Sequence, residues 1–510
     1  MKGCEIVVSS LKSHGVTHIF GYPGGSVLPV YDKLMDSGIT HILPTHEQFA
    51  CHAADGYARA TGKVGVVIAT SGPGATNLVT GIANAYMDSI PLVAITGNVK
   101  LSLLGHDAFQ EIDIAGVTMP ITKHNFIVKS ADELAGIMKK AFLIASSGRK
   151  GPVLVDIPVD IFEMETANTD VSPLPAREYH PLPAEIENAV AAVNDCEYPF
   201  ICAGGGVIAS EAAPELYEFA HRINSPVAVT AMGKGAFPAP DTLYAGVVGM
   251  NLGEQAKRAL KKCDLFIAMG IRFSERLMKN VVSFAPEAKI LHIDIDAAET
   301  GKNAGYHTRV VGDMKETLSV LLPRIKAKPY KGFTGGKPPA EGFFGVIEMH
   351  RSGAIVTTEV GLHQIEAVNR IGTEKPRTFI TSGGLGTMGF GLPAAIGAAV
   401  GTGMRVINVA GDGSFDMNIQ ELMTASRYGL PVIEVVVHNG ALGMIEKWQN
   451  EQYGGRVFQT KLPQVDYIEA ARGFGVEGES VRDTASLEEA LTRAESRRAP
   501  YVIIWEGDVI

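Results

Sequence analysis

Two oxygen-bearing side chains stand at the ends of two apolar, strand-like segments near the C-terminus. Asp412 follows 406-VINVA-410 and Asn439 follows 432-VIEVVVH-438, with a helix-like segment between them. A right-handed strand–helix–strand unit sets the carboxyl ends of neighbouring parallel strands side by side, so both side chains can face one point. A carboxylate, an amide oxygen and a loop carbonyl suit a hard cation such as Mg²⁺, which also binds phosphate. The alternative is that Asp412 caps a helix and Asn439 forms a turn.

Three glycine-rich loops could also do chemistry, because their backbone N–H groups and helix N-termini can face a phosphate. They are 71-SGPGATN-77, 382-SGGLGTMGFG-391 and 411-GDGS-414. None matches the Walker pattern GxxxxGK[ST], and none is a clean GxGxxG after a strand. The loops alone therefore do not establish a nucleotide site.

Short apolar runs rich in Val and Ile, each ending in Gly, Asp or Asn, indicate the elements that must position these residues. Strands buried on both faces read as continuous apolar runs, and helical patterns between them indicate parallel sheets. The sequence therefore predicts a multi-domain α/β protein. The predicted strand segments are 64–74, 92–98, 152–160, 265–272, 290–296, 406–413, 432–440 and 502–508.

Two polar or proline-rich stretches, 163–183 and 323–342, are predicted to be linkers. They leave an N-terminal domain at 1–165, a central domain at 184–325 and a C-terminal domain at 342–510, and the chain length of 510 residues allows about three domains. The first and third domains are rich in glycine at strand ends, where ligands bind in open parallel sheets.

Composition excludes several classes of function. The net charge of −10 comes without a basic block, so nucleic acid is not an expected partner. No apolar run is long enough to suggest a membrane span, and the start MKGCEIVVSSLKSHGV lacks the apolar core of a signal peptide. We therefore expect a cytoplasmic protein. The five cysteines form no CxxC pair and no zinc-like spacing, which indicates buried or incidental thiols.

Beyond these patterns, the GDG motif with its closing Asn439 resembles the diphosphate and metal motif of thiamine-diphosphate enzymes. The resemblance extends along nearly the whole chain to the large, catalytic subunit of acetohydroxyacid (acetolactate) synthase. It implies three doubly wound parallel-sheet domains: one that binds the pyrimidine ring, a central Rossmann-like domain and one that binds the diphosphate. Six segments carry it, in the same order as in the family: 20–32, 46–66, 70–93, 107–125, 378–398 and 442–449.

The resemblance implies that thiamine diphosphate supplies the carbanion chemistry while the protein holds and orients it. Glu47, within THEQ, matches the family's glutamate that hydrogen-bonds the aminopyrimidine ring and promotes its imino tautomer. Such a glutamate should lie in an apolar pocket, where desolvation favours the protonated form. The alternative is an ordinary carboxylate at a helix N-terminus.

Further site residues are carried over from the same resemblance. Met388 matches the bulky residue beneath the bend of the cofactor, and Asp412, Asn439 and the carbonyl of Ala441 match the Mg²⁺ ligands. The other residues that match cofactor contacts are Tyr22, Pro73, Asn77, His363, Gly386, Gly413, Ser414, Gly443 and Met444.

On the substrate side, Gly25 resembles a backbone donor near the reacting oxygen, a kind of contact that stabilises developing negative charge. The other matches are Phe109, Gln110, Lys123, Arg276 and Trp448, of which Gln110 and Lys123 join Glu47 and Gly25 as expected catalytic residues. The residues alone support two interpretations equally. Arg276 is either a substrate contact or a surface arginine, and Trp448 is either a substrate contact or a core tryptophan. The implied reaction decarboxylates pyruvate and joins the hydroxyethyl unit to pyruvate or 2-oxobutyrate, the first step of branched-chain amino-acid biosynthesis.

The resemblance also implies partners. In the family the first and last domains meet across a subunit boundary, so Glu47 would serve a cofactor held by another chain. A homodimer would be the smallest active unit, a homotetramer is a second possibility, and a small regulatory subunit is common.

The sequence departs from the family pattern in four places. His438 precedes Asn439 where a second Asn is usual, and Leu362 replaces a glutamine near the diphosphate. A GMHG stretch that helps to bind FAD in the central domain reads GMNL at 249–252, whereas other FAD-side positions persist at 204–207, 272–276 and 292–296, which leaves FAD binding open. The sequence ends soon after the last strand, where relatives carry a tail over the active site, and a more open site would favour decarboxylation over carboligation. Another thiamine-dependent decarboxylase or carboligase, or a non-catalytic paralogue, is therefore an alternative function.

Overall fold

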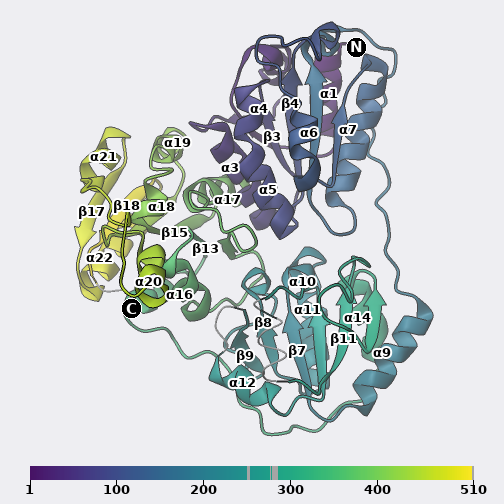
Figure 1. Cartoon of the computed structure of the whole chain (residues 1–510), viewed down its shortest axis with the longest axis vertical. Helices are drawn as coiled ribbons and strands as arrows, with labels where there is room; N and C mark the ends of the chain where they lie inside the picture. Colours follow the sequence, from purple (N-terminus) through teal and green to yellow (C-terminus); the bar gives the residue numbers. More distant parts are fainter. Residues whose placement is uncertain (250–252, 276, 278–284, 508–510) are drawn as a thin grey trace. The chain divides into compact units, whose positions relative to one another are not determined.

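Three six-stranded parallel sheets with flanking helices make up the computed structural model of the protein (Figure 1), which describes residues 1–249, 253–275, 277 and 285–507. This architecture confirms the predicted α/β class with three doubly wound sheets, and all eight segments predicted as strands contain one. The chain forms two compact units. The first holds residues 1–176, 353–364 and those from 380 onward, and the second holds 177–352 and 365–379.

The N-terminal sheet has the strand order β2-β1-β3-β4-β6-β5. Its strands are β1 (His18–Gly21), β2 (Thr40–Ile42), β3 (Gly65–Ala69), β4 (Leu92–Asn98), β5 (His124–Ile127) and β6 (Pro152–Pro158). The accompanying helices are α1 (Gly3–Ser13), α2 (Leu28–Leu34), α3 (Glu47–Thr61), α4 (Pro73–Asn77), α5 (Val79–Asp88), α6 (Ile114–Thr118), α7 (Ala131–Ser146) and α8 (Val159–Glu163), with 3-10 turns η1 (Gly25–Val27), η2 (Leu101–Leu103) and η3 (Met119–Ile121).

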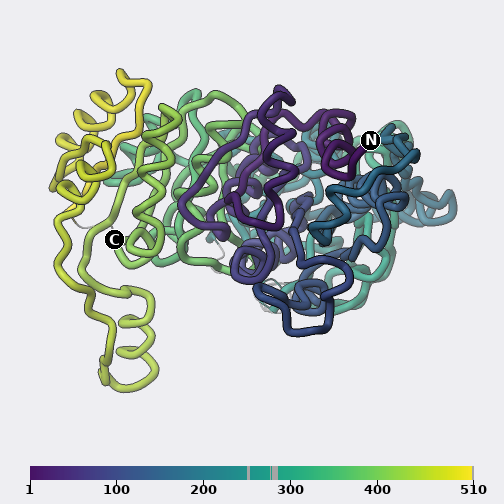
Figure 2. Tube along the Cα trace, turned by 90° about the horizontal axis from the view of Figure 1, so that it is seen from above, coloured from purple at the N-terminus to yellow at the C-terminus, as the bar shows by residue number. Residues whose placement is uncertain are grey.

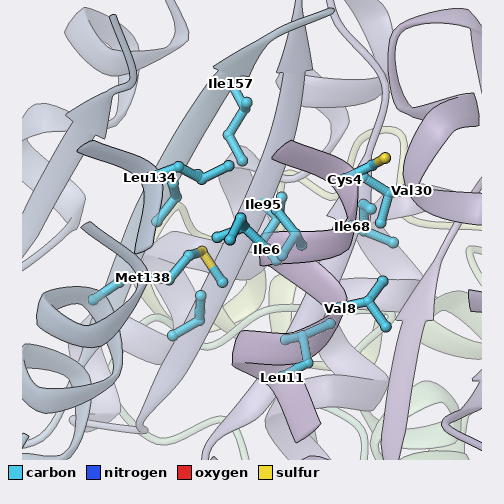
Figure 3. Packing of buried hydrophobic residues seen from close by; sticks show 14 of the residues in the cluster. Cys4, Ile6, Val8, Leu11, Val30, Ile68, Ile95, Leu134, Met138 and Ile157 are labelled. Atoms are coloured by element: carbon cyan, nitrogen blue, oxygen red, sulfur yellow. The ribbon is translucent and has the colours of Figure 1, made fainter. Parts of the chain in front are cut away.

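Two apolar cores cover the two faces of this sheet, as the continuous apolar runs predict. Successive side chains of a strand point to opposite faces, so Val66 and Ile68 of β3 join the core beneath α1 and α7, where Met138 packs (Figure 3). Val67 and Ala69 join the other core, which α3 and α5 cover. The sheet is therefore enclosed by helices, and its chemistry is left to the loops at the strand ends.

The C-terminal sheet repeats the same order of strands, β14-β13-β15-β16-β18-β17. Its strands are β13 (Ala354–Thr358), β14 (Phe379–Thr381), β15 (Arg405–Gly411), β16 (Val432–Val437), β17 (Glu477–Val481) and β18 (Tyr501–Trp505). Its helices are α17 (Gly391–Thr402), α18 (Asp412–Phe415), α19 (Glu421–Arg427), α20 (Gly443–Gln452), α21 (Tyr467–Gly473) and α22 (Thr484–Glu495), while α16 (Leu362–Arg370) begins in the first unit and ends in the second.

Helices α3 and α17, from the N- and C-terminal sheets of the first unit, pack closely enough to exclude side chains between them. A β-carbon at Gly56 would lie 2.2 Å from the carbonyl oxygen of Ala394, and one at Gly397 would come still closer to that of Ala53. Only glycine permits this backbone approach. The contact sets the position of α3, whose first residue is Glu47.

The second unit holds the central sheet, with the order β12-β11-β10-β7-β8-β9. Numbered within the sheet and in reverse, this is 3-2-1-4-5-6, the order of dinucleotide-binding folds. Its strands are β7 (Pro199–Ala203), β8 (Val227–Val229), β9 (Tyr244–Val247), β10 (Leu265–Met269), β11 (Lys289–Asp294) and β12 (Thr308–Val311). Described helices and turns of this unit are α9 (Pro183–Asp195), α10 (Gly205–Ala209), α11 (Ala213–Arg222), η4 (Ala231–Gly233), α12 (Glu254–Leu260), α14 (Met314–Leu321), η5 (Leu322–Arg324) and α15 (Gly342–His350).

The segments expected as linkers separate α8 from α9 and η5 from α15 and are largely irregular. The domain boundaries drawn from them stay predictions. All five cysteines are free and none is exposed, which confirms the expected thiols. None of the helices in the described part of the chain has the length and apolarity that crossing a membrane requires.

Candidate functional site

The strand order places two loop clusters where a ligand is expected. In the order 2-1-3-4, connections leave strands 1 and 3 in opposite directions, and the crevice outside their carboxyl ends binds ligands in doubly wound sheets. In the N-terminal sheet this point lies between β1 and β3, and in the C-terminal sheet between β13 and β15. We call the loop residues at the first point, among them Tyr22, Gly25, Glu47 and Asn77, the pyrimidine cluster. Those at the second point, among them His363, Met388, Asp412 and Asn439, are the diphosphate cluster. The names follow the ligand parts that the resemblance implies.

The diphosphate cluster joins Asp412 and Asn439, as their spacing predicted. Asp412 is 2% exposed, and its Oδ2 accepts hydrogen bonds from the backbone N–H groups of Asn439 (3.0 Å) and Gly440 (2.6 Å), while Oδ1 accepts from Gly413 (2.8 Å). Burial raises the pKa of the Asp412 carboxyl, and these three donors act against the rise. Asp412 therefore lies against the backbone of Asn439 at the ends of β15 and β16, and a shared cation between their side chains stays a prediction.

Local capping and turn contacts coexist with this arrangement. Asp412 is the first residue of α18, and the Oδ1 atom of Asn439 accepts a hydrogen bond from the backbone of Ala441 (2.9 Å). Ala441 also forms an antiparallel bridge with Lys461. No group of three or more His, Cys, Asp and Glu that could hold a metal occurs in the described residues. The predicted Mg²⁺ ligand set is not a group of that kind, because it consists of one carboxylate, one amide oxygen and one backbone carbonyl.

The fit of this cluster to a phosphate-bearing cofactor rests on His363. Its Nε2 atom is buried and has no hydrogen-bond partner, and β-carbons at Gly361 and Gly411 would lie 2.8 and 3.0 Å from its ring. Burial lowers the pKa of His363 to about 4, so the ring is neutral near pH 7. A buried, unpaired ring nitrogen beside a glycine-walled loop fits a polar group of a bound ligand, since buried polar atoms are normally satisfied.

The loop that carries Gly386 and Met388 reaches the same cluster. Gly386 has a φ of +71°, which suits glycine, and Met388 is half-buried. The next residue, Gly389, donates its N–H to Ser414 Oγ (3.1 Å) and to the carboxylate of Glu359 (2.9 Å). Sequence reasoning missed Glu359, although a carboxylate directly after a buried strand was a usable signal.

Helix α20 borders the cluster. A β-carbon at Gly443, its first residue, would lie 3.1 Å from Asn439 Nδ2 and 3.2 Å from Leu362 Cδ1, so Gly443 and the following Met444 lie beside the predicted metal ligands. Trp448 is 46% exposed, so its interpretation as a core tryptophan is wrong. Figure 2 shows α20 and the turn after it projecting from the rest of this domain.

In the pyrimidine cluster, Glu47 lies at the start of α3. Its Oε2 atom accepts a hydrogen bond from Asn77 Nδ2 (2.9 Å), and a β-carbon at Gly74 would lie 3.3 Å from its Oε1 atom. The contacts with Asn77 and Gly74 come from α4, which begins at Pro73. Within one chain Glu47 is half-buried and its Oε2 atom is bound to an amide, and the apolar pocket expected for it stays a prediction.

The loops after β1 and β3 are tied together next to Glu47. Ser26, which follows Gly25, shares a hydrogen bond with Thr70 through their hydroxyl oxygens (2.9 Å), and its Oγ atom accepts one from the Ser71 backbone (2.9 Å). Tyr22 also follows β1 and is 41% exposed. Gly25 and Tyr22 therefore share the strand ends with Glu47.

The remaining predicted substrate residues differ in placement. Gln110 has a φ of +60°, and its Cα would lie 2.9 Å from a β-carbon at Gly72; the preceding Phe109 is 88% exposed. Lys123 directs its ammonium to the carbonyls of Ile144 and Ser147 at the end of α7. Those contacts cap a helix, so a substrate role for Lys123 stays a prediction. Arg276 lies outside the described residues.

In the central domain, the glycine loops considered for FAD pack against each other through their backbones, and FAD binding stays open. The glycine loops after β7 and β10 touch each other: Gly206 donates its N–H to the Gly270 carbonyl (3.1 Å), and a β-carbon at Gly204 would lie 2.3 Å from that oxygen. These glycines are therefore accounted for without a flavin. Residues 250–252 of GMNL lie outside the described residues.

Comparison with known proteins gives matches along the chain. Three family models match: the thiamine pyrophosphate enzyme N-terminal TPP binding domain at residues 1–117, the central domain at 186–321 and the C-terminal TPP binding domain at 359–505. The probable acetolactate synthase large subunit of Methanocaldococcus jannaschii is 44% identical, over 99% of this chain and 91% of the relative. The acetolactate synthase isozyme 2 large subunit of Escherichia coli is 41% identical, over 99% and 95%.

Among solved structures, a thiamine diphosphate-dependent 4-hydroxybenzoylformate decarboxylase from Rhodococcus jostii matches with a TM-score of 0.90 at 23% identity, covering 99% of this chain and 98% of that one. A putative thiamin diphosphate-dependent enzyme from Mycobacterium smegmatis matches with a TM-score of 0.86 at 24% identity, covering 99% of both chains. At these identities the two structures establish the fold alone.

Proposed function

Since the chain belongs to the acetolactate synthase large-subunit family of thiamine pyrophosphate enzymes, we propose that it makes 2-acetohydroxy acids from 2-oxo acids. It decarboxylates pyruvate and joins the hydroxyethyl unit to a second pyruvate or to 2-oxobutyrate, the first step of branched-chain amino-acid biosynthesis. The observation that carries this proposal is the meeting of Asp412 and Asn439 at the ends of β15 and β16, beside the unpaired Nε2 atom of His363.

The diphosphate cluster has the donor set for a metal-bound diphosphate. Asp412, Asn439 and the carbonyl of Ala441 would hold Mg²⁺, since hard cations prefer oxygen ligands. Gly413 and Ser414 follow Asp412 in the first turn of α18, where backbone N–H groups can face an anion, and His363 offers a neutral ring nitrogen. Thiamine diphosphate, when bound, supplies stabilisation of negative charge on the carbon that loses CO₂.

Met388 and Glu47 would control the reactive part of the cofactor. Met388, held in the loop that Ser414 binds through Gly389, would support the bend between the two rings. Glu47 would hold a proton at the pyrimidine nitrogen, and the bond from Asn77 fixes its Oε2 atom and leaves Oε1 beside Gly74. Gly25 would offer its backbone N–H to an oxygen of the substrate, the kind of contact that stabilises developing charge.

A second copy of the chain is the proposed partner. Four large apolar side chains on or just after α20 are exposed: Ile445, Trp448, Tyr453 and Phe458. Several exposed apolar side chains on one projecting segment suit a surface that another protein covers. Each Glu47 would then serve the cofactor of the other chain. The relatives are named large subunits, which supports a small regulatory subunit, and cytoplasm remains the predicted location.

The test is a product assay with purified protein, thiamine diphosphate, Mg²⁺ and pyruvate, with and without FAD, in which CO₂, acetolactate and acetaldehyde are measured together. We expect acetolactate in amounts that match the CO₂ released. Acetaldehyde with CO₂ would instead identify a decarboxylase, and no turnover of any 2-oxo acid would identify a non-catalytic paralogue. Dependence on FAD would assign the central domain as a flavin site, and independence would agree with the packing of its glycines.

A further inference from the structure

Glu359 occupies the point where the order of the C-terminal sheet reverses. It directly follows β13, is 0% exposed, and its backbone N–H donates to the carbonyl of Val409 in β15 (2.9 Å). A β-carbon at Gly391, the first residue of α17, would lie 2.7 Å from that same nitrogen. The Met388 loop and the end of β13 are therefore in direct contact.

The Glu359 carboxylate binds both cofactor loops at once. Its Oε2 atom accepts hydrogen bonds from the N–H of Gly389 (2.9 Å) and the hydroxyl of Ser414 (2.7 Å). Its Oε1 atom accepts from the N–H of Leu392 (3.2 Å) and the side-chain amide of Asn418 (2.5 Å). Two of these donors belong to the segment after Met388, and the other two to the segment that begins with GDGS.

Burying a carboxylate costs desolvation free energy even when four donors surround it. Its presence is therefore weak evidence that it serves only to stabilise the fold. Burial raises the pKa of Glu359, whereas the hydrogen bonds from Ser414, Asn418 and the backbone act against the rise. An amide cannot replace the carboxylate here. Each carboxylate oxygen faces a backbone N–H, and one of them would meet the amide's NH₂ group instead.

We propose that Glu359 is a positioning residue, which fixes the Met388 loop against the GDGS loop so that both receive thiamine diphosphate in one geometry. The proposal rests on the cofactor of the proposed function. It concerns binding of that cofactor and is independent of which 2-oxo acid reacts.

Glu434 in β16 provides a matched control. It is equally buried, but both of its oxygens accept from the single side-chain amide of Asn408 (2.8 and 3.0 Å), whose Oδ1 atom accepts from Thr357. Burial, with the nearby Glu359, raises the pKa of Glu434 well above its ordinary value, which favours the protonated form. Glutamine is nearly isosteric with a neutral glutamate, and Glu434→Gln should change cofactor binding little.

The experiment compares Glu359→Gln, Glu359→Asp and Glu434→Gln. For each, thiamine diphosphate is titrated with Mg²⁺ by calorimetry, and the melting temperature is measured with and without the cofactor. We expect Glu359→Gln to bind the cofactor at least about tenfold more weakly, equivalent to about 1.4 kcal/mol, and to lose much of the cofactor-induced rise in melting temperature. Glu359→Asp, which keeps the charge, should recover part of both, and the Michaelis constant for pyruvate should change less than cofactor affinity.

Cofactor affinity separates positioning from simple stabilisation of the fold. A lower melting temperature of cofactor-free Glu359→Gln with unchanged affinity would overturn the proposal. If Glu359→Gln does not fold, Asn418→Ala, which removes one donor to the same carboxylate, should weaken binding to a smaller extent, and unchanged affinity there would also overturn it. A chain that binds thiamine diphosphate but forms no acetolactate would refute the proposed function and leave this inference intact.

Discussion

Asn77 donates a hydrogen bond from its side-chain amide to Glu47 Oε2 at 2.9 Å, and so ties the loop after β3 to the start of α3. The bond fixes one carboxylate oxygen and leaves the other beside Gly74, which has no side chain of its own. A proton-transfer role depends on such orientation as well as on the carboxylate itself.

Glu47→Gln tests this role directly. The amide keeps the size of the side chain but cannot share a proton with the pyrimidine ring, so turnover should fall by at least about 100-fold, with thiamine diphosphate affinity largely kept. Calorimetry for affinity and acetolactate formation for turnover check both. Glu133→Gln, in the exposed first turn of α7, serves as the control and should match the wild type. Unchanged turnover in Glu47→Gln would refute the assigned role.

Asp412→Ala tests the magnesium site. Loss of a metal ligand should raise the half-activating Mg²⁺ concentration at least about tenfold, because even indirect partners of a ligand cost that much in metal affinity. The variant also leaves the N–H groups of Asn439 and Gly440 without their acceptor, so its melting temperature should fall. A magnesium titration of activity measures the first effect. Full activity at trace Mg²⁺ would reject the metal assignment.

Local sequence patterns predicted the glycine-rich loops and the pairing of Asp412 with Asn439, whereas the other site residues came from the family resemblance. Asp412 and Asn439 follow buried strands, and the right-handed connection between parallel strands brings them together. Sequence patterns did not identify Glu359 as a site residue, because its partners Gly389 and Asn418 lie 30 and 59 positions further along the chain. The position of Glu359 directly after a buried strand was a local signal, but the convergence of its donors depends on strand order, which no local pattern gives.

The exposure and the contacts of a side chain in the folded protein cannot be read from the residue type alone. Trp448 has a core-like side chain but lies on α20, which buries none of its residues. Lys123 lies within a matching segment and donates to carbonyls at the end of α7, and its substrate role stays a prediction. The close approach of α3 and α17 at Gly56 and Gly397 joins two domains, and glycine in a helix pattern does not identify its partner.

We expect the stability of α3 to depend on pH because of His52. Burial holds its pKa at about 3, against an ordinary value of 6.5, and its ring packs edge-on against Phe390. Below pH 6.5 the unfolded chain therefore binds a proton that the folded one does not, so stability is lost as the pH falls. This one group should cost about 2 kcal/mol by about pH 5. Hydrogen exchange of α3 amides, corrected for intrinsic rates, should accelerate on acidification, and His52→Leu should reduce that acceleration. An equal response in both proteins would contradict the prediction.

Gly397→Ala tests whether α3 and α17 need their close backbone contact. The added methyl group would lie far inside contact distance of the Ala53 carbonyl, so the helices must separate. Overpacking of this kind costs about 1–3 kcal/mol, and the melting temperature should fall accordingly. Gly136→Ala in α7 is the matched control, because a β-carbon there meets nothing within 4 Å, and alanine in a helix interior gains up to about 1 kcal/mol. Since α3 begins at Glu47, Gly397→Ala should also lower turnover more than it lowers cofactor affinity. Equal melting temperatures for the two variants would mean that α3 and α17 do not approach as closely in solution.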